Sequence, residues 1–328
     1  MKKFYRFFSA LVIILLAFSA CPTGDVLQQI LSTTVEVPVF LDCRAVSTTE
    51  ITFRFSQHVR VVSLNFDPAL PIKSIEEGEE VKISFSQPLE EGQKVTADIL
   101  VEDTGTNTLN VIVPFRTRND RMPVLVFNEV RTDYSRPRVE FVEFFVLEGG
   151  NLGAMRLFIA GHSISRPAYE FAPMEIGKGE YLLLHLRTLE EGTVDNASEL
   201  WVPGTTKLLR RTDALWLVDQ DDRIIDALLL SENPGVVWAN QNIAVAAELF
   251  GREKAWLPPG DAESGANSGA NSAWIPGPSD AVISAGTTAT RTINCDESLA
   301  PAPRAGNWYI TATSGNTPGR PNDPRRHN

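Results

Sequence analysis

The chain has 328 residues and is acidic, with 41 Asp and Glu against 30 Lys and Arg and a net charge of −11. The first 20 residues hold three basic side chains and no acidic ones, so the remaining 308 residues carry a net charge of −14. Such a charge repels phosphate backbones and argues against general binding to nucleic acid or anionic lipid. A cationic group stands near the end, which we interpret as a solvated tail: Arg320, Arg325 and Arg326.

The start of the chain has the pattern of an export signal. Its first six residues hold three basic side chains, an apolar run covers 7–18, and the small residues Ser19 and Ala20 precede Cys21. The run is too short to span a bilayer as a permanent helix. The pattern predicts a secretory signal peptide over residues 1–20.

The stretch "FSAC" around Cys21 resembles the lipobox of bacterial lipoproteins. The resemblance implies that Cys21 receives acyl chains such as palmitate, two or more of which anchor a protein stably to a membrane. Phe18 stands where that family usually has Leu, so ordinary secretion is the alternative. Pro22 replaces the Asp that often retains lipoproteins on the inner membrane, which favours the outer membrane and leaves its periplasmic or surface face undecided.

Two further cysteines, Cys43 and Cys295, lie 252 residues apart. An exported pair makes a disulfide one candidate arrangement. Nothing local in the sequence brings the two together, and two buried free thiols are the favoured alternative.

Residues 21–34 have the composition of a short tether, and short strand-like runs follow it. Apolar side chains occupy alternate positions of four such runs, which are separated by acidic or glycine-containing turns: "EITFRFS" (50–56), "EVKISFS" (80–86), "KVTADILVED" (94–103) and "NVIVPFRT" (110–117). Period-two alternation predicts antiparallel strands with one buried face, and strands at this spacing indicate a β-sandwich.

The segments "TTEITFRFSQHV", "QPLEEGQKVTADILVEDTGTNTL" and "VPFRTRN" together resemble bacterial Ig-like domains of surface-layer and adhesin proteins, over residues 35–120. Asp103, Gly105 and Asn107 fill the family's penultimate turn, with Asn107 displaced by one residue. The resemblance implies an Ig-like sandwich that acts as a spacer or a binding module.

A polar linker at 118–123 leads into a second β-patterned region. The runs "YLLLHL" and "LWLV" are apolar on both faces, as expected of central strands, and a helical period appears near 241–251. Six segments resemble, in order, the signatures of the lamin-tail domain, an Ig-like β-sandwich: "VFNEV" (126–130), "VEFVEFF" (139–145), "GKGEYLLL" (177–184), "DALWLVDQDDRIIDAL" (213–228), "TATRT" (288–292) and "SGNTPGRPN" (314–322).

The lamin-tail resemblance covers residues 121–322, followed by a tail at 323–328, and implies that the last turn belongs to the fold. Pro318 and Pro321 restrict φ there while Gly319 permits a positive φ. We therefore expect an all-β protein of two Ig-like β-sandwich domains in tandem.

The second region departs from that family by an insertion at about 231–287. It contains the predicted helix and the repetitive "SGANSGANS" (264–272), a composition typical of a flexible surface loop. Three tryptophans lie in or beside it: Trp238, Trp256 and Trp274. They form either a contact surface or a cover for the sandwich edge, and we favour the cover.

Motifs of catalysis and metal binding do not occur in the sequence. The sequence has four histidines, at His58, His162, His185 and His327. They do not have the spacing of metal ligands, and no nucleophile elbow or phosphate loop is present. His185 is interpreted as a satisfied internal or edge histidine. The acidic "DQDDR" (219–223) lacks the further ligands of a calcium loop and is interpreted as a turn between strands. No catalytic residue, metal or cofactor is predicted.

Glu129 and Glu143 lie on apolar strands, where a carboxylate is costly unless it is paired. Two such acids are compatible with acid–base catalysis. The lamin-tail resemblance implies structural roles instead, because both match recurrent glutamates of that family and Arg291 matches its recurrent arginine. The hypothesis is an ion pair between one of these acids and Arg291.

Taken together, the patterns predict a lipid-anchored, non-enzymatic protein of the cell envelope that binds, adheres or scaffolds through a protein or glycan partner. One alternative is accessory service to a secreted nuclease or phosphatase, which lamin-tail domains often accompany in bacteria. The other is direct nucleic-acid binding, which the net charge opposes.

Overall fold

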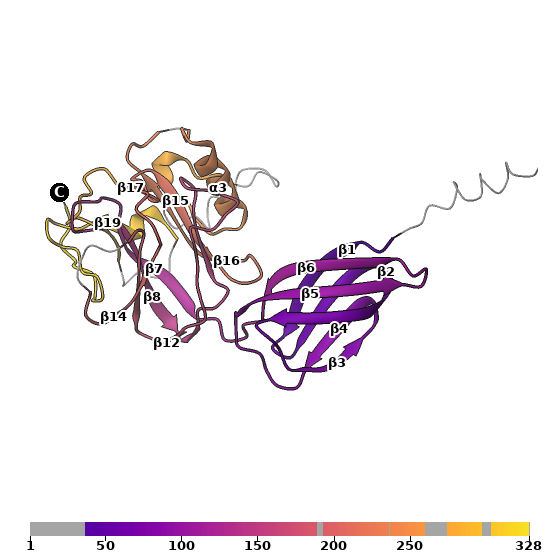
Figure 1. Ribbon diagram of the computed structural model, residues 1–328. Coiled ribbons are helices and arrows are strands. Elements are labelled where there is room, and N and C mark those ends of the chain that lie inside the picture. The colour runs from indigo at the N-terminus through magenta and orange to yellow at the C-terminus, as the bar shows by residue number, and fades with distance from the viewer. Residues whose placement is uncertain (1–36, 189–192, 236, 260–273, 297–302, 328) are drawn as a thin grey trace, which may run out of the picture.

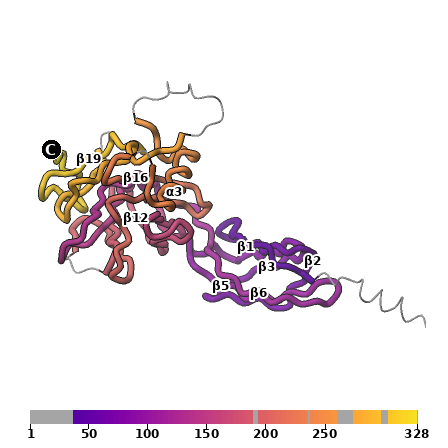
Figure 2. Tube along the Cα trace, turned by 90° about the horizontal axis from the view of Figure 1, so that it is seen from above, coloured from indigo at the N-terminus to yellow at the C-terminus, as the bar shows by residue number. Residues whose placement is uncertain are grey.

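The protein is described here as a computed structural model, which defines residues 37–188, 193–235, 237–259, 274–296 and 303–327. Strands dominate this part of the chain and form two lobes joined by one connection, as Figures 1 and 2 show. The all-β prediction is therefore confirmed. The predicted signal peptide with Cys21, the tether and the repeat at 264–272 lie outside the described residues.

The N-terminal domain is one antiparallel sheet of six strands, in the order β3-β4-β2-β5-β6 with β1 added to β2. Its strands are β1 (Phe40–Ser47), β2 (Glu50–Asp67), β3 (Ile72–Glu76), β4 (Gly78–Phe85), β5 (Lys94–Asp103) and β6 (Thr108–Arg116). The four predicted runs lie in β2, β4, β5 and β6.

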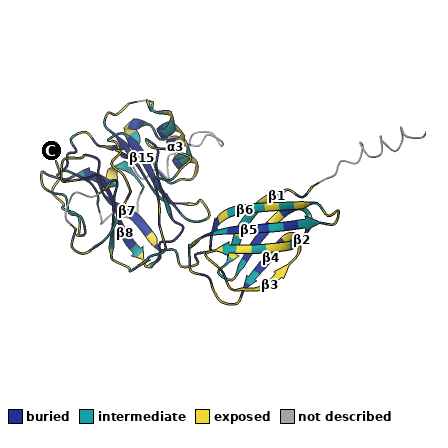
Figure 3. Cartoon of the chain, in the orientation of Figure 1, coloured by how far each residue is buried: buried dark blue, intermediate teal, exposed yellow. Residues whose placement is uncertain are grey.

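Strand β2 has 18 residues and extends far beyond the predicted run. Its first half pairs with β1 and β4, and its second half pairs with β5. The strand therefore passes from one layer into the other. Phe53 in the first half meets Phe115 of β6 edge to face at 6.5 Å, and Phe66 in the second half meets Phe85 of β4 at 5.8 Å. A single hydrogen-bonded sheet thus supplies both layers of a sandwich, and Figure 3 shows its alternating buried and exposed positions.

The C-terminal domain has two larger sheets. One has the order β14-β13-β8-β7-β18-β19, with β7 (Val124–Arg131), β8 (Phe141–Glu148), β13 (Tyr181–His185), β14 (Ala197–Trp201), β18 (Ile293–Cys295) and β19 (Trp308–Ile310). The other has the order β11-β10-β15-β16-β17, with β10 (Arg156–Ile159), β11 (Tyr169–Glu170), β15 (Asp213–Val218), β16 (Ile224–Ser231) and β17 (Val282–Ile283). A short ribbon pairs β9 (Gly150–Asn151) with β12 (Glu175–Ile176).

The inserted helix covers the outer face of the second sheet. Helix α3 (Gln241–Arg252) matches the predicted 241–251 and begins at Asn240, whose side chain accepts a hydrogen bond from the Asn242 amide. Phe250 packs edge to face on Trp216 of β15, with ring centroids 5.7 Å apart. Every residue of β15 is buried, because the core lies on one side of the strand and the helix on the other. The prediction of a central strand from "LWLV" is confirmed.

The three tryptophans near the insertion belong to this covering layer. Trp256 is 1% exposed and donates its indole N–H to the Asp280 carbonyl at 2.8 Å. Trp238 donates to the Pro276 carbonyl at 2.9 Å, and Trp274 packs against the core. This packing agrees with the favoured interpretation, because the tryptophans cover apolar groups of the sandwich.

We predict that Trp256→Ala lowers the free energy of unfolding by about 3–5 kcal/mol, because truncation of a fully buried aromatic leaves a cavity. Urea titration followed by circular dichroism measures the change. Ile275→Ala is the control, since Ile275 is 55% exposed in the same covering segment and should change stability by less than about 0.5 kcal/mol. Equal effects of the two variants would contradict the role given to Trp256.

Candidate functional site

The last turn of the chain has the geometry that its sequence predicts. The Thr317 carbonyl accepts the Arg320 amide at 3.0 Å, and Gly319 has φ of 75°. Pro318 at the second position and a positive-φ glycine at the third define a type II turn. A Cβ at Gly319 would lie 2.6 Å from the Asp195 carbonyl oxygen. The turn is therefore pressed against the loop before β14, and only glycine fits at this position.

The two predicted glutamates lie directly beneath this turn. Glu129 on β7 and Glu143 on β8 are paired in register, and both side chains are fully buried. Their neighbours Val130 and Val142 belong to the core, so the two acids point to the opposite, outer face of the sheet. The Thr317 amide donates to Glu129 Oε2 at 3.0 Å, and the Gly319 amide donates to Glu143 Oε2 at 2.6 Å.

Three asparagines complete this contact, which we call the C-terminal clasp: Glu129, Glu143, Asn128, Asn294, Asn322 and the turn 317–320. Asn322 donates to the Asn128 side chain and to the Cys295 carbonyl, both at 2.9 Å. Asn294 donates to the Asn322 side chain at 2.7 Å. Strands β7, β8 and β18 are thereby all bonded to the chain end. The resemblance-based expectation that the final turn is part of the fold agrees with this geometry.

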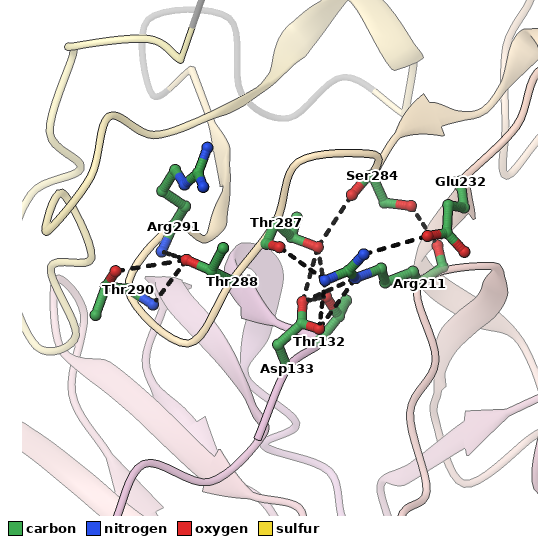
Figure 4. A network of polar contacts seen from close by, with 9 residues as sticks. All are labelled: Thr132, Asp133, Arg211, Glu232, Ser284, Thr287, Thr288, Thr290 and Arg291. Atoms are coloured by element: carbon green, nitrogen blue, oxygen red, sulfur yellow. Dashed lines mark hydrogen bonds and ion pairs between the residues drawn. The ribbon is translucent and has the colours of Figure 1, made fainter. Parts of the chain in front are cut away.

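The predicted partner of the glutamates is wrong. Arg291 directs its Nη1 to the ring of His327, at 2.8 Å from Nε2, and its backbone closes a small turn onto Thr288 (Figure 4). The cation near Glu129 is Arg131, which is 1% exposed and lies 4.6 Å above the Phe141 ring. Residues two apart on a strand share a face, so the spacing of Glu129 and Arg131 was the available signal.

Burial raises the pKa of the Glu129 carboxyl from 4.5 to about 7. Hydrogen bonds from Thr292 and Thr317 and the charge of Arg131 oppose this rise. A second carboxylate directly across the ladder is unfavourable as well, because like charges in cross-strand pairs repel. Glu129 therefore holds its proton in the folded protein over a range in which a solvated glutamate has lost it.

A second polar cluster ties the insertion to both sheets (Figure 4). Arg211 forms a two-pronged contact with Asp133, at 3.0 Å from Nε and 2.8 Å from Nη2, and its Nη2 also donates to the Thr287 carbonyl. Burial alone would raise the pKa of Asp133, but bonds from Arg211, Thr287 and Thr132 keep it below its usual value. The Arg211 side chain donates to Asp133, to Glu232 and to the Thr287 carbonyl. We therefore assign the cluster a structural role.

His185 and the acidic segment 219–223, which the sequence also singled out, have partners within the fold. His185 is buried, lies 2.8 Å from Glu199 and stacks on Trp201. Asp219 closes the β15–β16 turn by accepting the Asp221 and Arg223 amides at 2.8 and 2.9 Å, which confirms the turn interpretation. Among the residues that the structure describes, no cluster of three His, Cys, Asp or Glu side chains is placed to hold a metal.

The cysteines are not paired with each other. Cys43 lies on β1 and Cys295 on β18, in different domains, and no disulfide joins them. The disulfide alternative is therefore wrong; of the two thiols that were expected to be buried, Cys295 is buried and Cys43 is half-buried. Burial, with the neighbouring Asp42 charge, raises the pKa of the Cys43 thiol to about 12.

The polar linker, in contrast to its flexible composition, is fixed. Asn119 is 1% exposed and donates its side-chain amide to the Asn151 and Gly153 carbonyls at 2.7 and 2.8 Å. Gln220 brackets its backbone, accepting from the Asn119 amide at 2.9 Å and donating to its carbonyl at 2.7 Å. Because the side chain and the main chain of Asn119 are both bonded to the C-terminal domain, the linker is not a free hinge.

Ion pairs and close backbone contact join the two domains beside this linker. Arg121 bridges Glu91 of the N-terminal domain and Glu175 of the C-terminal domain, at 2.6 and 2.7 Å. A Cβ on Gly92 would lie 2.3 Å from the Gly153 backbone, so the domains touch main chain to main chain. The exposed pairs contribute little individually. Their number and the buried Asn119 fix one arrangement.

We predict that stability falls as the pH rises from 5 to 8. Glu129, Asp213 and Asp226 have pKa values raised to about 7, 6 and 7, mainly by burial. The folded state then binds more protons than the unfolded state, and the stabilisation is lost as the pH rises through the folded values. Glu129→Gln removes one titrating group. Between pH 5 and 8 the unfolding free energy of this variant should therefore fall less than that of the wild type, by at most about 3 kcal/mol.

Urea titrations at several pH values between 5 and 8 measure this dependence. The control is Glu148→Gln, since Glu148 is an exposed residue at the end of β8. An unchanged pH slope in Glu129→Gln would show that the clasp carboxyl does not titrate in this window.

We predict that Asn119→Ala loosens the junction while both domains stay folded. Small-angle scattering should show a broader distance distribution, because three hydrogen bonds of the linker are lost. The matched control is Asn110→Ala on the exposed side of β6. Identical scattering curves for the wild type and both variants would mean that the Gln220 bonds, the ion pairs and the backbone contact fix the arrangement without the Asn119 side chain.

Comparisons with known proteins identify a bacterial relative and a structural neighbour of this chain. A protein from Treponema pallidum (strain Nichols), described as an uncharacterized protein, is 26% identical over 198 residues, which cover 53% of this chain and 50% of that protein. The chain thus matches about half the length of that relative. The N-terminal part of the bacterial S-layer protein SbsC is a structural neighbour with 13% identity and a TM-score of 0.24, covering 60% of this chain and 44% of the other.

The family model described as "TP_1001_2nd: protein second domain" matches residues 123–310. This range begins where the fixed linker ends and includes every strand of the C-terminal domain. More than half of the chain lies within it, and the chain therefore belongs to the TP_1001 second-domain family.

Proposed function

We propose that this chain is a lipid-anchored protein of the cell envelope, held to the outer membrane through Cys21 and acting as a non-catalytic binding, adhesion or scaffolding module. The observation that carries the proposal is the fixed junction. Two β domains are joined through the buried Asn119 and the bridging Arg121, so together they form one rigid unit. Rigid spacing of two domains suits a protein that presents a surface to a partner.

The N-terminal sequence supports the anchor in this proposal, with its signal-like run and the lipobox-like "FSAC". No helix among the described residues is long and apolar enough to cross a membrane. We further propose that the C-terminal domain is a sandwich of the lamin-tail type and the N-terminal domain one of the surface-layer or adhesin type. The ordered motifs support this, as does the clasp that seals the chain end onto β7 and β8.

Acylation of Cys21 is tested by fractionation of cells that express the full-length protein. The wild type should sediment with membranes, require detergent for release and incorporate a labelled palmitate analogue. Cys21→Ser should lose the label and shift to the soluble fraction, because removal of the acyl chains removes the membrane affinity. Cys43→Ser is the control and should fractionate like the wild type. A Cys21→Ser protein that stays membrane-bound would overturn the anchor.

The face of the membrane is decided by protease treatment of intact cells and of cells with a permeabilised outer envelope. Digestion of intact cells would place both domains outside and favour adhesion. Protection until permeabilisation would place them in the periplasm and favour a scaffolding role.

A further inference from the structure

The two domains enclose a cleft of about 720 Å³ on one side of their junction. Its walls come from β1 and β6 of the N-terminal domain and from β10, β11 and the β15–β16 turn of the C-terminal domain. The lining residues are mostly polar and charged, and the arginines among them are Arg44, Arg116, Arg118, Arg156 and Arg223. Cavities of a few hundred Å³ between domains are the usual place for a small ligand.

The charge of this cleft is opposite to that of the chain. Five arginines face three acidic residues, Glu170, Asp221 and Asp222, so the lining is positive in a protein of net charge −11. A local surplus of positive charge inside an acidic surface concentrates small anions while the surrounding field repels long polyanions. The cleft therefore selects for compact anionic ligands over nucleic acid.

Three of the five arginines are already paired. Arg116 contacts Glu170 at 2.5 Å, Arg118 contacts Asp221 at 2.9 Å, and Arg156 contacts Asp222 at 2.8 Å. The first pair joins the two domains, and the second joins the linker to the C-terminal domain. They hold the cleft walls in place before any ligand arrives, and a preformed site loses less free energy to ordering on binding.

Arg44 and Arg223 are the other two. Both are exposed, and neither has a carboxylate within 4 Å among the residues that the structure describes. Arg44 lies on β1 of the N-terminal domain and Arg223 just before β16 of the C-terminal domain. A guanidinium group binds carboxylate or phosphate through two parallel N–H donors. Each domain thus supplies one uncommitted anion-binding group to the same cleft.

We propose that this interdomain cleft binds a compact ligand that carries at least two carboxylate or phosphate groups, contacted by Arg44 from one domain and Arg223 from the other. This specifies the ligand class for the binding role proposed above and rests on it. Because the ligand bridges both domains, its binding stabilises the junction as well.

The test is isothermal titration of the full-length protein in detergent solution with citrate, which carries carboxylates, and with inorganic pyrophosphate. Sucrose at equal concentration is the neutral control. We expect saturable one-to-one binding of at least one anion, weakened by salt, and no binding of sucrose. Citrate alone, pyrophosphate alone or both binding would identify the anionic group that the cleft accepts.

The double variant Arg44→Gln/Arg223→Gln should reduce the affinity for the bound anion at least tenfold. The control double variant Arg60→Gln/Arg166→Gln makes the same change in net charge at exposed positions outside the cleft. It should change the affinity for the bound anion less than twofold. Absence of saturable binding of both anions, or an equal loss in the two double variants, would overturn the proposal. Neither result affects the Cys21 fractionation, so the anchor and the cleft are judged separately.

Discussion

Burial of two carboxylates on the outer face of one sheet is the constraint on which the C-terminal domain depends. Glu129 and Glu143 face each other across β7 and β8 and are fully buried, a placement that costs several kcal/mol unless donors are supplied. The donors are backbone amides of the final turn. Neither part is stable in this form alone, since the acids need the turn to satisfy them and the turn needs the acids to hold it. The chain end is therefore part of the fold.

The junction between the domains follows the same logic on a smaller scale. A buried asparagine satisfies carbonyl groups of the C-terminal domain, while a glutamine from the β15–β16 turn satisfies the linker in return. Polar groups in both cases replace the apolar contact that more often fixes neighbouring elements. Hydrogen bonds are directional, so they determine one geometry where an apolar patch would permit several. That geometry produces the positive cleft, whose walls belong to different domains.

The sequence predicted the strands well because their signal is local. Alternation over 94–103 placed Val95, Ala97, Ile99 and Val101 in the core, and all four are fully buried. The type II turn was also predictable, since Pro318 and Gly319 determine its dihedral angles without help from the rest of the chain. Helix α3 followed from its periodicity in the same way.

Contacts between distant segments were not accessible from the sequence. Arg291 was assigned to the glutamates by family resemblance, while the cation that lies near Glu129 is Arg131 on the same strand. The linker at 118–123 has the composition of a flexible segment, and its rigidity depends on Asn151, Gly153 and Gln220, which are 32 to 101 residues away. The cleft also depends on contacts between distant segments, so the sequence did not single out any of its arginines.

The burial of Cys43 bears on how the folded protein responds to oxidants. Only the thiolate form of cysteine attacks disulfides or reacts readily with oxidants. Burial raises the pKa of the Cys43 thiol to about 12, so the thiol form dominates at neutral pH. Cys295 is enclosed in the other domain. The Cys43 thiol is therefore a poor nucleophile toward disulfides and oxidants while the N-terminal sheet is folded.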